Sequence, residues 1–430
     1  MPPIEDHPLR YQLANELHAR PFPTITAPAT VVYLAIKPAE PGERRDRDAD
    51  RDADRAHLLA LLDRHGAPHP HPGATHHSGR IGRHVLKWEQ HTEFVTYTAF
   101  CDGLGERPFD PADFAVFPDD WLARAPGQRI TAIAFRICPM PEEAAVRAAL
   151  DAWFVPESLA VARVLDDLAI AAGDFRIDPA GQMRFALFVA PGLGPRRVGR
   201  AVQRLCEIET YKSMAMLGFA RARALTAPLD RLDRRLTGLT SEMTAENARA
   251  DSLLPELLTI SAELESMAAR AAFRFGATGA YAAIVGERIT ALRETRFEGR
   301  PTFGEFMARR FEPAMRTVAA TRARLQSLSD RAARAGDLMR TRVDVERSAQ
   351  NQKLLASMDR RAALQLRLQH TVEGLSVVAI SYYAVSLALY VLGPLAPQIG
   401  LTKPALTAFL TPPLILATWA ALRRIRRRLE

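Results

Sequence analysis

Residues 374–402 read GLSVVAISYYAVSLALYVLGPLAPQIGLT, and residues 404–422 read PALTAFLTPPLILATWAAL. Neither run contains a charged side chain, and only Lys403 separates them. One helix needs about 20 apolar residues to cross the hydrocarbon core of a bilayer. The first run supplies such a helix before Gly393 and Pro394, and the second supplies a return helix. The two runs therefore predict a transmembrane hairpin over residues 372–422, with the lipid bilayer as a partner.

Basic residues flank this hairpin on both sides: Arg360, Arg361 and Arg367 precede it, and Arg423, Arg424, Arg426, Arg427 and Arg428 follow it. The turn between the two runs carries only Lys403. Because cytoplasmic flanks are enriched in Lys and Arg, both termini are expected in the cytoplasm, with residues 423–430 as a basic tail. The first ten residues lack the basic and then apolar pattern of a signal peptide, so the hairpin is expected to direct the chain to an inner membrane.

Composition limits the remaining classes. The chain has 430 residues, 48% of them hydrophobic, and a net charge of +8. Such a chain can form packed cores, so disorder throughout is excluded. Nucleic acid is not an expected partner, because acidic residues interleave with the basic ones and the densest basic cluster flanks the hairpin. The cysteines Cys101, Cys138 and Cys206 are isolated, so neither a disulfide framework nor a zinc ribbon is indicated.

Residues 1–194 alternate strand-like and helix-like segments. Strands are expected at residues 31–36, 83–100, 130–137 and 183–189, and helices at residues 53–64, 142–154 and 159–170. This order predicts an N-terminal α/β domain. Residues 44–55 read RRDRDADRDADR, and eight of the eleven histidines lie between residues 57 and 91. We therefore expect residues 40–82 to be an inserted, partly disordered loop around one helix.

Residues 195–371 read as helices. The expected helices cover residues 196–224, 228–244, 253–275, 281–296 and 303–371, with breaks near Gly276, Gly279 and Gly299. The last helix has roughly 70 residues, or about 100 Å at its full length, and runs into the first membrane helix. The 3 and 4 spacing of Leu325, Leu328, Ala332, Ala335 and Met339 is typical of a coiled-coil or bundle seam. Pro412 and Pro413 remove backbone donors within the second membrane helix, which favours a homo-oligomer or tight packing of the hairpin. The predicted fold class is α+β.

Four segments carry a resemblance to a known family: HPLRYQLANELHARPFP at residues 7–23, LKWEQHTEF at 86–94, GRAVQRLCEIETYKSMAMLG at 199–218, and LLASMDRRAALQLRLQHTVEGLSVVAISYYAV at 354–385. In this order they are similar to the DUF3422 family of bacterial membrane-anchored proteins. The resemblance covers nearly the whole chain, and it implies that the protein is anchored in a membrane. It supplies no catalytic residues.

The predicted architecture also resembles that of CorA-type divalent-cation channels, which are homopentamers whose first membrane helix lines the pore. The Gly-Met-Asn motif of those channels is missing, and residues 390–397 read YVLGPLAP in its place. On this analogy the residues expected along an ion path are Asp359, His370, Glu373 and Ser381. A ring of Glu373 would concentrate a divalent cation at the cytoplasmic mouth. The alternatives are a solvated helix face for the charged residues and helix packing for the serine.

Two groups in the N-terminal domain have the side chains that bind metals. Glu89, His91 and Glu93 share one face of a strand by the two-residue period, with Trp88 and Phe94 on the other face. The second group is the histidine tract His69, His71, His76 and His77, which could bind zinc or nickel transiently. The alternative for the first group is a half-exposed strand, and the alternative for the histidine tract is an exposed loop. His18 and Arg20 are a third candidate, for an anion pocket, and the alternative is that they make surface contacts that seat the N-terminal segment.

Enzyme motifs are absent from the sequence: there is no GxGxxG after a strand, no GxxxxGK[ST], no HExxH and no GxSxG. The chain is therefore not expected to be an enzyme. Two functions remain open. One is an oligomeric membrane protein that conducts or senses divalent cations. The other is a membrane-tethered scaffold or module that binds a cytoplasmic protein partner.

Overall fold

The computed structural model describes residues 4–16, 22–38, 47–243, 250–394 and 402–429. Its elements in chain order are α1 (Arg10–Glu16), β1 (Ala29–Lys37), α2 (Arg47–Arg64), β2 (His76–Ile81), β3 (His84–Gln90), β4 (Val95–Asp102), η1 (Pro111–Val116), α3 (Asp119–Leu122), β5 (Gln128–Pro139), α4 (Glu143–Trp153), η2 (Pro156–Ser158), β6 (Ala160–Val164), β7 (Ala169–Ile177), β8 (Met183–Val189), α5 (Pro195–Met243), α6 (Ala250–Leu292), β9 (Thr295–Arg296), α7 (Phe303–Arg310), α8 (Glu312–Leu392) and α9 (Lys403–Leu429). The chain forms two compact units. The first comprises residues 1–246 and 255–334, and the second residues 247–254 and 335–430.

A nine-stranded sheet organises the first unit, with the strand order β2-β3-β4-β1-β5-β8-β7-β6-β9. Neighbouring strands are antiparallel except β5 and β8, which are parallel. The predicted α+β class is confirmed, because this mixed sheet is accompanied by long helices. The strands expected at residues 31–36, 130–137 and 183–189 are β1, β5 and β8.

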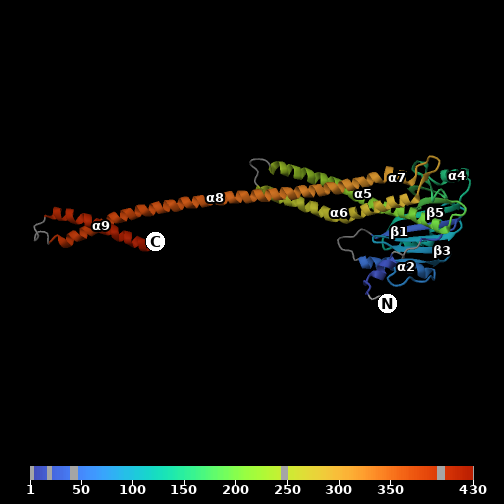
Figure 1. Cartoon of the computed structure of the whole chain (residues 1–430), viewed down its shortest axis with the longest axis horizontal. Coiled ribbons are helices and arrows are strands. Elements are labelled where there is room, and N and C mark those ends of the chain that lie inside the picture. Colours follow the sequence, from blue (N-terminus) through green and yellow to red (C-terminus); the bar gives the residue numbers. More distant parts are fainter. Residues whose placement is uncertain (1–3, 17–21, 39–46, 244–249, 395–401, 430) are drawn as a thin grey trace. The chain divides into compact units, whose positions relative to one another are not determined.

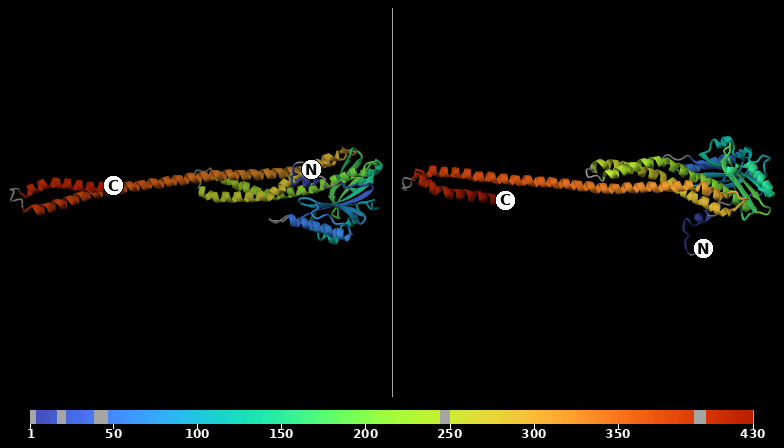
Figure 2. Two further views of the ribbon diagram at one scale, coloured as in Figure 1. Left: turned by 60° about the horizontal axis from the view of Figure 1, so that its bottom comes forward. Right: turned by 90° about the horizontal axis from the view of Figure 1, so that it is seen from above.

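Helices cover both faces of the sheet. Because successive side chains of a strand point to opposite faces, Val31 and Tyr33 of β1 join a core with α5, α6 and α7. Val32 and Leu34 join a second core with α2 and α3 on the other face. Helix α4 covers that same face over β5 to β8. Figures 1 and 2 show α5 and α6 on one side of the strands and α2 on the other.

Two hairpins correct the expected elements of this unit. The single strand expected at residues 83–100 is divided into β3 and β4, because the chain turns between Gln90 and Val95. The helix expected at residues 159–170 is instead the hairpin of β6 and β7. Its turn places Leu165, Asp166 and Asp167 at φ values of 57°, 61° and 63°, which a right-handed helix does not contain.

The expected disordered insertion is also corrected where the structure describes it. Residues 47–81 contain α2 and β2, and Leu58, Leu61, Leu62 and Ile81 are fully buried against the sheet. Residues 47–55 of the charge run belong to this helix, while its apolar side chains at 3 and 4 spacing supply a packing face. Residues 39–46 of the same stretch lie outside the described residues.

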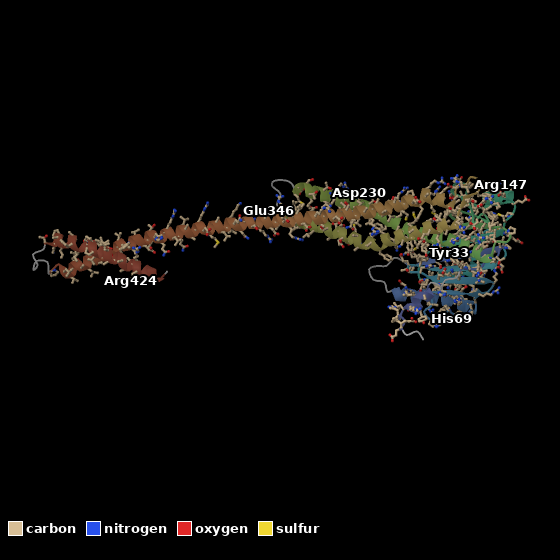
Figure 3. All side chains as sticks on the ribbon, viewed as in Figure 1. Tyr33, His69, Arg147, Asp230, Glu346 and Arg424 are labelled. Carbon is tan, nitrogen blue, oxygen red and sulfur yellow. The ribbon has the colours of Figure 1, made fainter. Side chains whose placement is uncertain are left out.

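Helices α5, α6 and the first part of α8 extend the first unit as a bundle. The break expected at Gly276 and Gly279 is absent, since α6 continues through both residues. At the crossing of α5 and α6, a Cβ atom on Gly218 would lie 2.0 Å from Thr278 Oγ1, so only glycine permits this approach. Across the bundle, Arg324 donates to Asp230 (2.6 Å), which is labelled in Figure 3.

Helix α8 runs unbroken into the second unit and ends at Leu392. The expected helix at residues 303–371 is therefore confirmed from residue 312 onward, with α7 as a separate short helix before it. All five expected seam residues, Leu325, Leu328, Ala332, Ala335 and Met339, are buried. Helix α9 follows residues 395–401, which are not described. Both helices include a segment long and apolar enough to cross a membrane.

Candidate ligand-binding site

A pocket of about 340 Å³ lies in the first unit between the sheet and α5. Strands β1, β3 and β4 form its floor, and α5 forms the opposite wall. The end of α6, through Arg288 and Ala291, and the segment with Phe22 and Pro23 complete the rim. Its lining combines aromatic rings with several ionisable and hydroxyl side chains.

Strand register assembles the floor. Lys87 of β3 lies opposite Thr98 of β4, and Thr98 lies opposite Tyr33 of β1, so the three side chains form one row across the sheet. Glu89 lies opposite Thr96 in the adjacent row. By the two-residue period these residues face α5. Tyr33 is labelled in Figure 3, and its hydroxyl lies 2.8 Å from Thr210 Oγ1 of α5.

A chain of polar contacts crosses the pocket from the sheet to α6. Lys87 Nζ lies 3.0 Å from Glu89 Oε2 and donates to Gln203 Oε1 at 3.0 Å. The amide nitrogen of Gln203 donates to Glu207 Oε1 at 2.8 Å, and Arg288 Nε donates to the other oxygen of Glu207. Because Gln203 uses both ends of its amide, this chain holds each charged group in one orientation.

Aromatic rings form one wall of the pocket. His91 stacks on Phe94 with ring centroids 4.4 Å apart, and Phe94 meets the edge of Tyr211 at 5.8 Å. Tyr211 in turn stacks on Tyr281 of α6 at 5.4 Å. Glu93 holds this wall in place, since it accepts hydrogen bonds from the Tyr281 hydroxyl and from Arg274 Nη2, each at 2.7 Å. Burial, with the bond to Glu93, raises the pKa of Tyr281 far above its usual value.

The rim depends on one glycine of α5. A Cβ atom on Gly199 would lie 1.7 Å from the carbonyl oxygen of Pro23, so the chain at Pro23 lies directly on the helix backbone. The next contact is a hydrogen bond from the Ile25 amide to the Pro195 carbonyl at 3.2 Å. These contacts seat Phe22 over the pocket, where the Arg200 guanidinium lies 5.9 Å from its ring centre.

Burial also sets the ionisation of groups around the pocket. The pKa of Cys206 is raised well above its usual value, mainly because its thiol is fully buried and also because Glu207 is near. The pKa of Tyr33 is raised for the same main reason. The pKa of Arg204 is lowered by burial and by the neighbouring guanidinium groups of Arg200 and Arg288.

The structure does not assemble the metal site expected from the strand Glu89, His91 and Glu93. The strand ends at Gln90, so the alternation does not extend to residues 91–93. Glu89 pairs with Lys87, His91 stacks on Phe94, and Glu93 binds Tyr281 and Arg274. Phe94, expected on the opposite face, lines the same pocket as Glu89.

The histidine tract is divided in the same way. His71, His76 and His77 line a neighbouring pocket of about 740 Å³, whereas His69 lies outside that lining with Nε2 at 2.6 Å from Asp63. Burial lowers the pKa of His77, with smaller contributions from His76 and His69. Within the described part of the chain, no three His, Cys, Asp or Glu side chains are arranged to hold a metal ion. Figure 3 shows His69 beside α2. His18 and Arg20 lie outside the described residues.

The four expected ion-path residues lie on one side of α8. Successive helical residues are about 100° apart, so Asp359, His370, Glu373 and Ser381 fall within an arc of about 80°. Asp359 and His370 are exposed, and Glu373 accepts a hydrogen bond from Gln369 at 3.3 Å. Ser381 is buried and its hydroxyl lies 2.7 Å from Thr418 Oγ1 of α9.

Sequence reasoning missed most of the pocket: Tyr33, Lys87, Gln203, Arg204 and Arg288 were not candidates. One signal was present. Gln203, Glu207 and Thr210 follow the 4 and 3 spacing of one helix face, which places three polar side chains on the same side of α5. Their partners are Lys87 of β3, Arg288 of α6 and Tyr33 of β1, which are all remote in sequence and could be identified only from the fold.

Comparison with known families gives one match. The family DUF3422, described as "Protein of unknown function (DUF3422)", matches residues 5–429. No curated protein and no solved structure matches the chain. Three of the four segments that carry the resemblance meet at the pocket: residues 7–23 supply Phe22 and Pro23, residues 86–94 supply part of the floor, and residues 199–218 supply the α5 wall. The match covers essentially the whole chain, which therefore belongs to the DUF3422 family.

Proposed function

We propose that the protein is a membrane-anchored module that binds a small ligand in the pocket between β3 and α5. The pocket volume of about 340 Å³ supports this proposal, because ligand sites usually measure roughly 300–1,000 Å³. Such sites also combine an apolar lining with a few convergent polar groups. The aromatic wall and the chain of contacts from Glu89 to Arg288 give the pocket both properties.

Preorganisation is the second support. Lys87 and Glu89 are about nine-tenths buried, and each remaining member of the polar chain is held by a neighbour before any ligand enters. A ligand that enters therefore has little side-chain entropy to remove, which favours binding.

The same groups favour binding over catalysis. Burial keeps the Cys206 thiol protonated at neutral pH, and a thiol must ionise to act as a nucleophile. Tyr33 is engaged with Thr210 and its pKa is also raised. We accordingly propose that the ligand leaves the pocket unchanged.

The two C-terminal helices provide the anchor in this proposal. Their apolar side chains are exposed, as at Val378 (70% exposed) and Phe409 (80%), and exposed apolar helices of this length suit lipid. Arg423 and Arg424, which follow the apolar part of α9, favour an inner-membrane location with cytoplasmic termini. The proposed module would then face the cytoplasm, where a protein partner or a second copy could read its ligand state.

The cation-channel alternative receives no support from the contacts of α8. The side of α8 that carries Ser381 is turned toward Thr418 of α9, which accounts for this serine by helix packing. His370 Nδ1 lies 3.6 Å from Glu373 in the same helix. We therefore propose that the hairpin anchors the chain without conducting ions.

A ligand screen on the full chain in detergent tests the binding proposal. Small polar metabolites are added at millimolar concentration, and the unfolding temperature is measured for the wild type, Ala291→Phe and Ala283→Phe. Ala291 lines the pocket, so the larger ring should fill it, whereas Ala283 is an exposed residue of the same helix. Stabilisation by at least one compound is expected in the wild type and in Ala283→Phe but not in Ala291→Phe. Stabilisation that survives Ala291→Phe, or that no compound produces, contradicts the proposal.

A further inference from the structure

We propose that the ligand of the pocket between β3 and α5 is a small organic monocarboxylate with a ring-sized apolar body. This inference rests on the proposed function, because it names the class of ligand for the same pocket. It is carried by the balance of charge in the lining, by the free donor capacity of Arg204 and by the aromatic wall.

The lining has one positive charge in excess. Its cationic side chains are Lys87, Arg204 and Arg288, and its carboxylates are Glu89 and Glu207. Lys87 is paired with Glu89, and Arg288 with Glu207. Among the described residues, no carboxylate lies within ion-pair distance of Arg204. Glu207 is the nearest stabilising charge, but it is paired with Arg288, so an anionic ligand beside Arg204 would supply a counter-ion in direct contact.

Arg204 also has donors to offer. A guanidinium group carries five N–H donors, and Nη1 of Arg204 donates to the carbonyl oxygen of Ala291 at 2.9 Å. That bond orients the planar group at the rim of the pocket. A carboxylate can accept two parallel hydrogen bonds from one guanidinium, which matches this arrangement. A phosphate monoester carries nearly two negative charges at neutral pH, which exceeds the single unpaired cation.

The rest of the ligand should be apolar and about the size of a ring. Phe94, Tyr211 and Val202 line the pocket on the side of α5 and the aromatic wall. A buried cavity of roughly 150 Å³ holds one benzene molecule, so a pocket of about 340 Å³ has room for a ring together with its carboxylate.

Four probes of similar size test this class on the full chain in detergent: benzoate, neutral benzamide, cationic benzylamine and dianionic phenyl phosphate. Dissociation constants are measured by calorimetry for the wild type, Arg204→Gln and Arg231→Gln. Arg231 is an exposed residue of the same helix and serves as the matched control. Benzoate is expected to bind the wild type about tenfold more tightly than benzamide, because hydrogen bonds to charged groups are the stronger ones. Arg204→Gln should remove this difference, and Arg231→Gln should retain it.

The outcomes separate this inference from the proposed function. Binding of benzamide or benzylamine that equals benzoate, and that Ala291→Phe abolishes, would overturn the monocarboxylate class while supporting the pocket as a ligand site. Tighter binding of phenyl phosphate than of benzoate would overturn the monocarboxylate class as well, while supporting the pocket as a site for anions. Absence of binding by all four probes at millimolar concentration, together with no response in the metabolite screen, would overturn both.

Discussion

The ammonium group of Lys87 lies 3.0 Å from a carboxylate oxygen of Glu89, and the two side chains are only 8% and 11% exposed. They are two residues apart on β3, and both face α5. Leu86, which precedes Lys87, and Trp88, which lies between the pair, are fully buried on the other face of the sheet. This buried ion pair is the part of the polar lining that the sheet contributes to the pocket.

Glu89→Gln should destabilise the first unit, because Lys87 would remain buried without its carboxylate. Breaking one partner of a buried ion pair typically costs about 3 kcal/mol or more. Urea unfolding of the detergent-solubilised chain, followed by tryptophan fluorescence, measures the change, since Trp88 lies in the same strand. Glu287→Gln is the control, because Glu287 is 70% exposed and lies 4.0 Å from Arg288. An equal effect of the two substitutions would contradict the role assigned to the buried pair.

Gly199→Ala should displace the segment that carries Phe22 and Pro23 from the pocket rim. The added methyl group would overlap the Pro23 carbonyl, and overpacking of this kind typically costs about 1–3 kcal/mol. Hydrogen exchange should accelerate at the Ile25 amide, which is bonded to Pro195. Gly238→Ala in the same helix meets no atom within 4 Å and should instead stabilise the chain by roughly 0.5–1 kcal/mol. Unchanged exchange at Ile25 in Gly199→Ala would refute the contact.

Asp233→Asn should weaken the bundle at neutral pH but not in acid. The hydrogen bonds from Arg331 and Arg324 lower the pKa of Asp233 below its usual value of 3.8, so its stabilising effect is present above that pH and is lost as the pH falls through the lowered pKa. The pair is partly exposed, so the difference at pH 7 should be at most about 1 kcal/mol. Urea unfolding of both proteins at pH 7 and at a pH below the lowered value measures it. A difference in the free energy of unfolding that persists at the acidic pH would contradict the role assigned to the ionised Asp233 carboxylate.

A disulfide should form between α8 and α9 in Ser381→Cys/Thr418→Cys. The two hydroxyl oxygens lie 2.7 Å apart, so the substituted sulfur atoms should come within bonding reach. The test uses membranes, a mild oxidant and a chain without its three native cysteines, and it detects the bond by mobility after proteolysis between the helices. Ser376→Cys/Thr418→Cys is the control, because the Ser376 hydroxyl donates to Val372 of its own helix. Equal crosslinking of both pairs would contradict the packing of the hairpin.

Local patterns predicted much of the fold. The strands at residues 31–36 and 183–189 and the uninterrupted course of α8 followed from β-branched content and helical spacing. Tight turns were missed where an apolar segment could be either a helix or a strand. The turn of the β6–β7 hairpin has Asp166 and Asp167 in left-handed conformations, and the spacing of apolar residues does not reveal such a turn. Glycines at 276 and 279 were misread as a break, because tertiary packing of α6 overrides their low helix propensity.

The candidate site was far less predictable. Glu89 and His91 were identified as polar residues near one face, but their partners on α5 and α6 are remote in sequence. Lys87 neutralises Glu89, and Arg274 neutralises Glu93, so carboxylates that suggested a metal site are internal ion-pair partners. Residue type alone could not distinguish these two roles.

The central claim is that the first unit binds a ligand while the two C-terminal helices only anchor the chain. Its most direct test is Mg²⁺ entry into liposomes that contain the purified full chain, followed with a trapped fluorescent indicator. The account predicts no entry above that of protein-free liposomes, for the wild type and for Glu373→Ala alike. Mg²⁺ entry in the wild type that Glu373→Ala abolishes would contradict it.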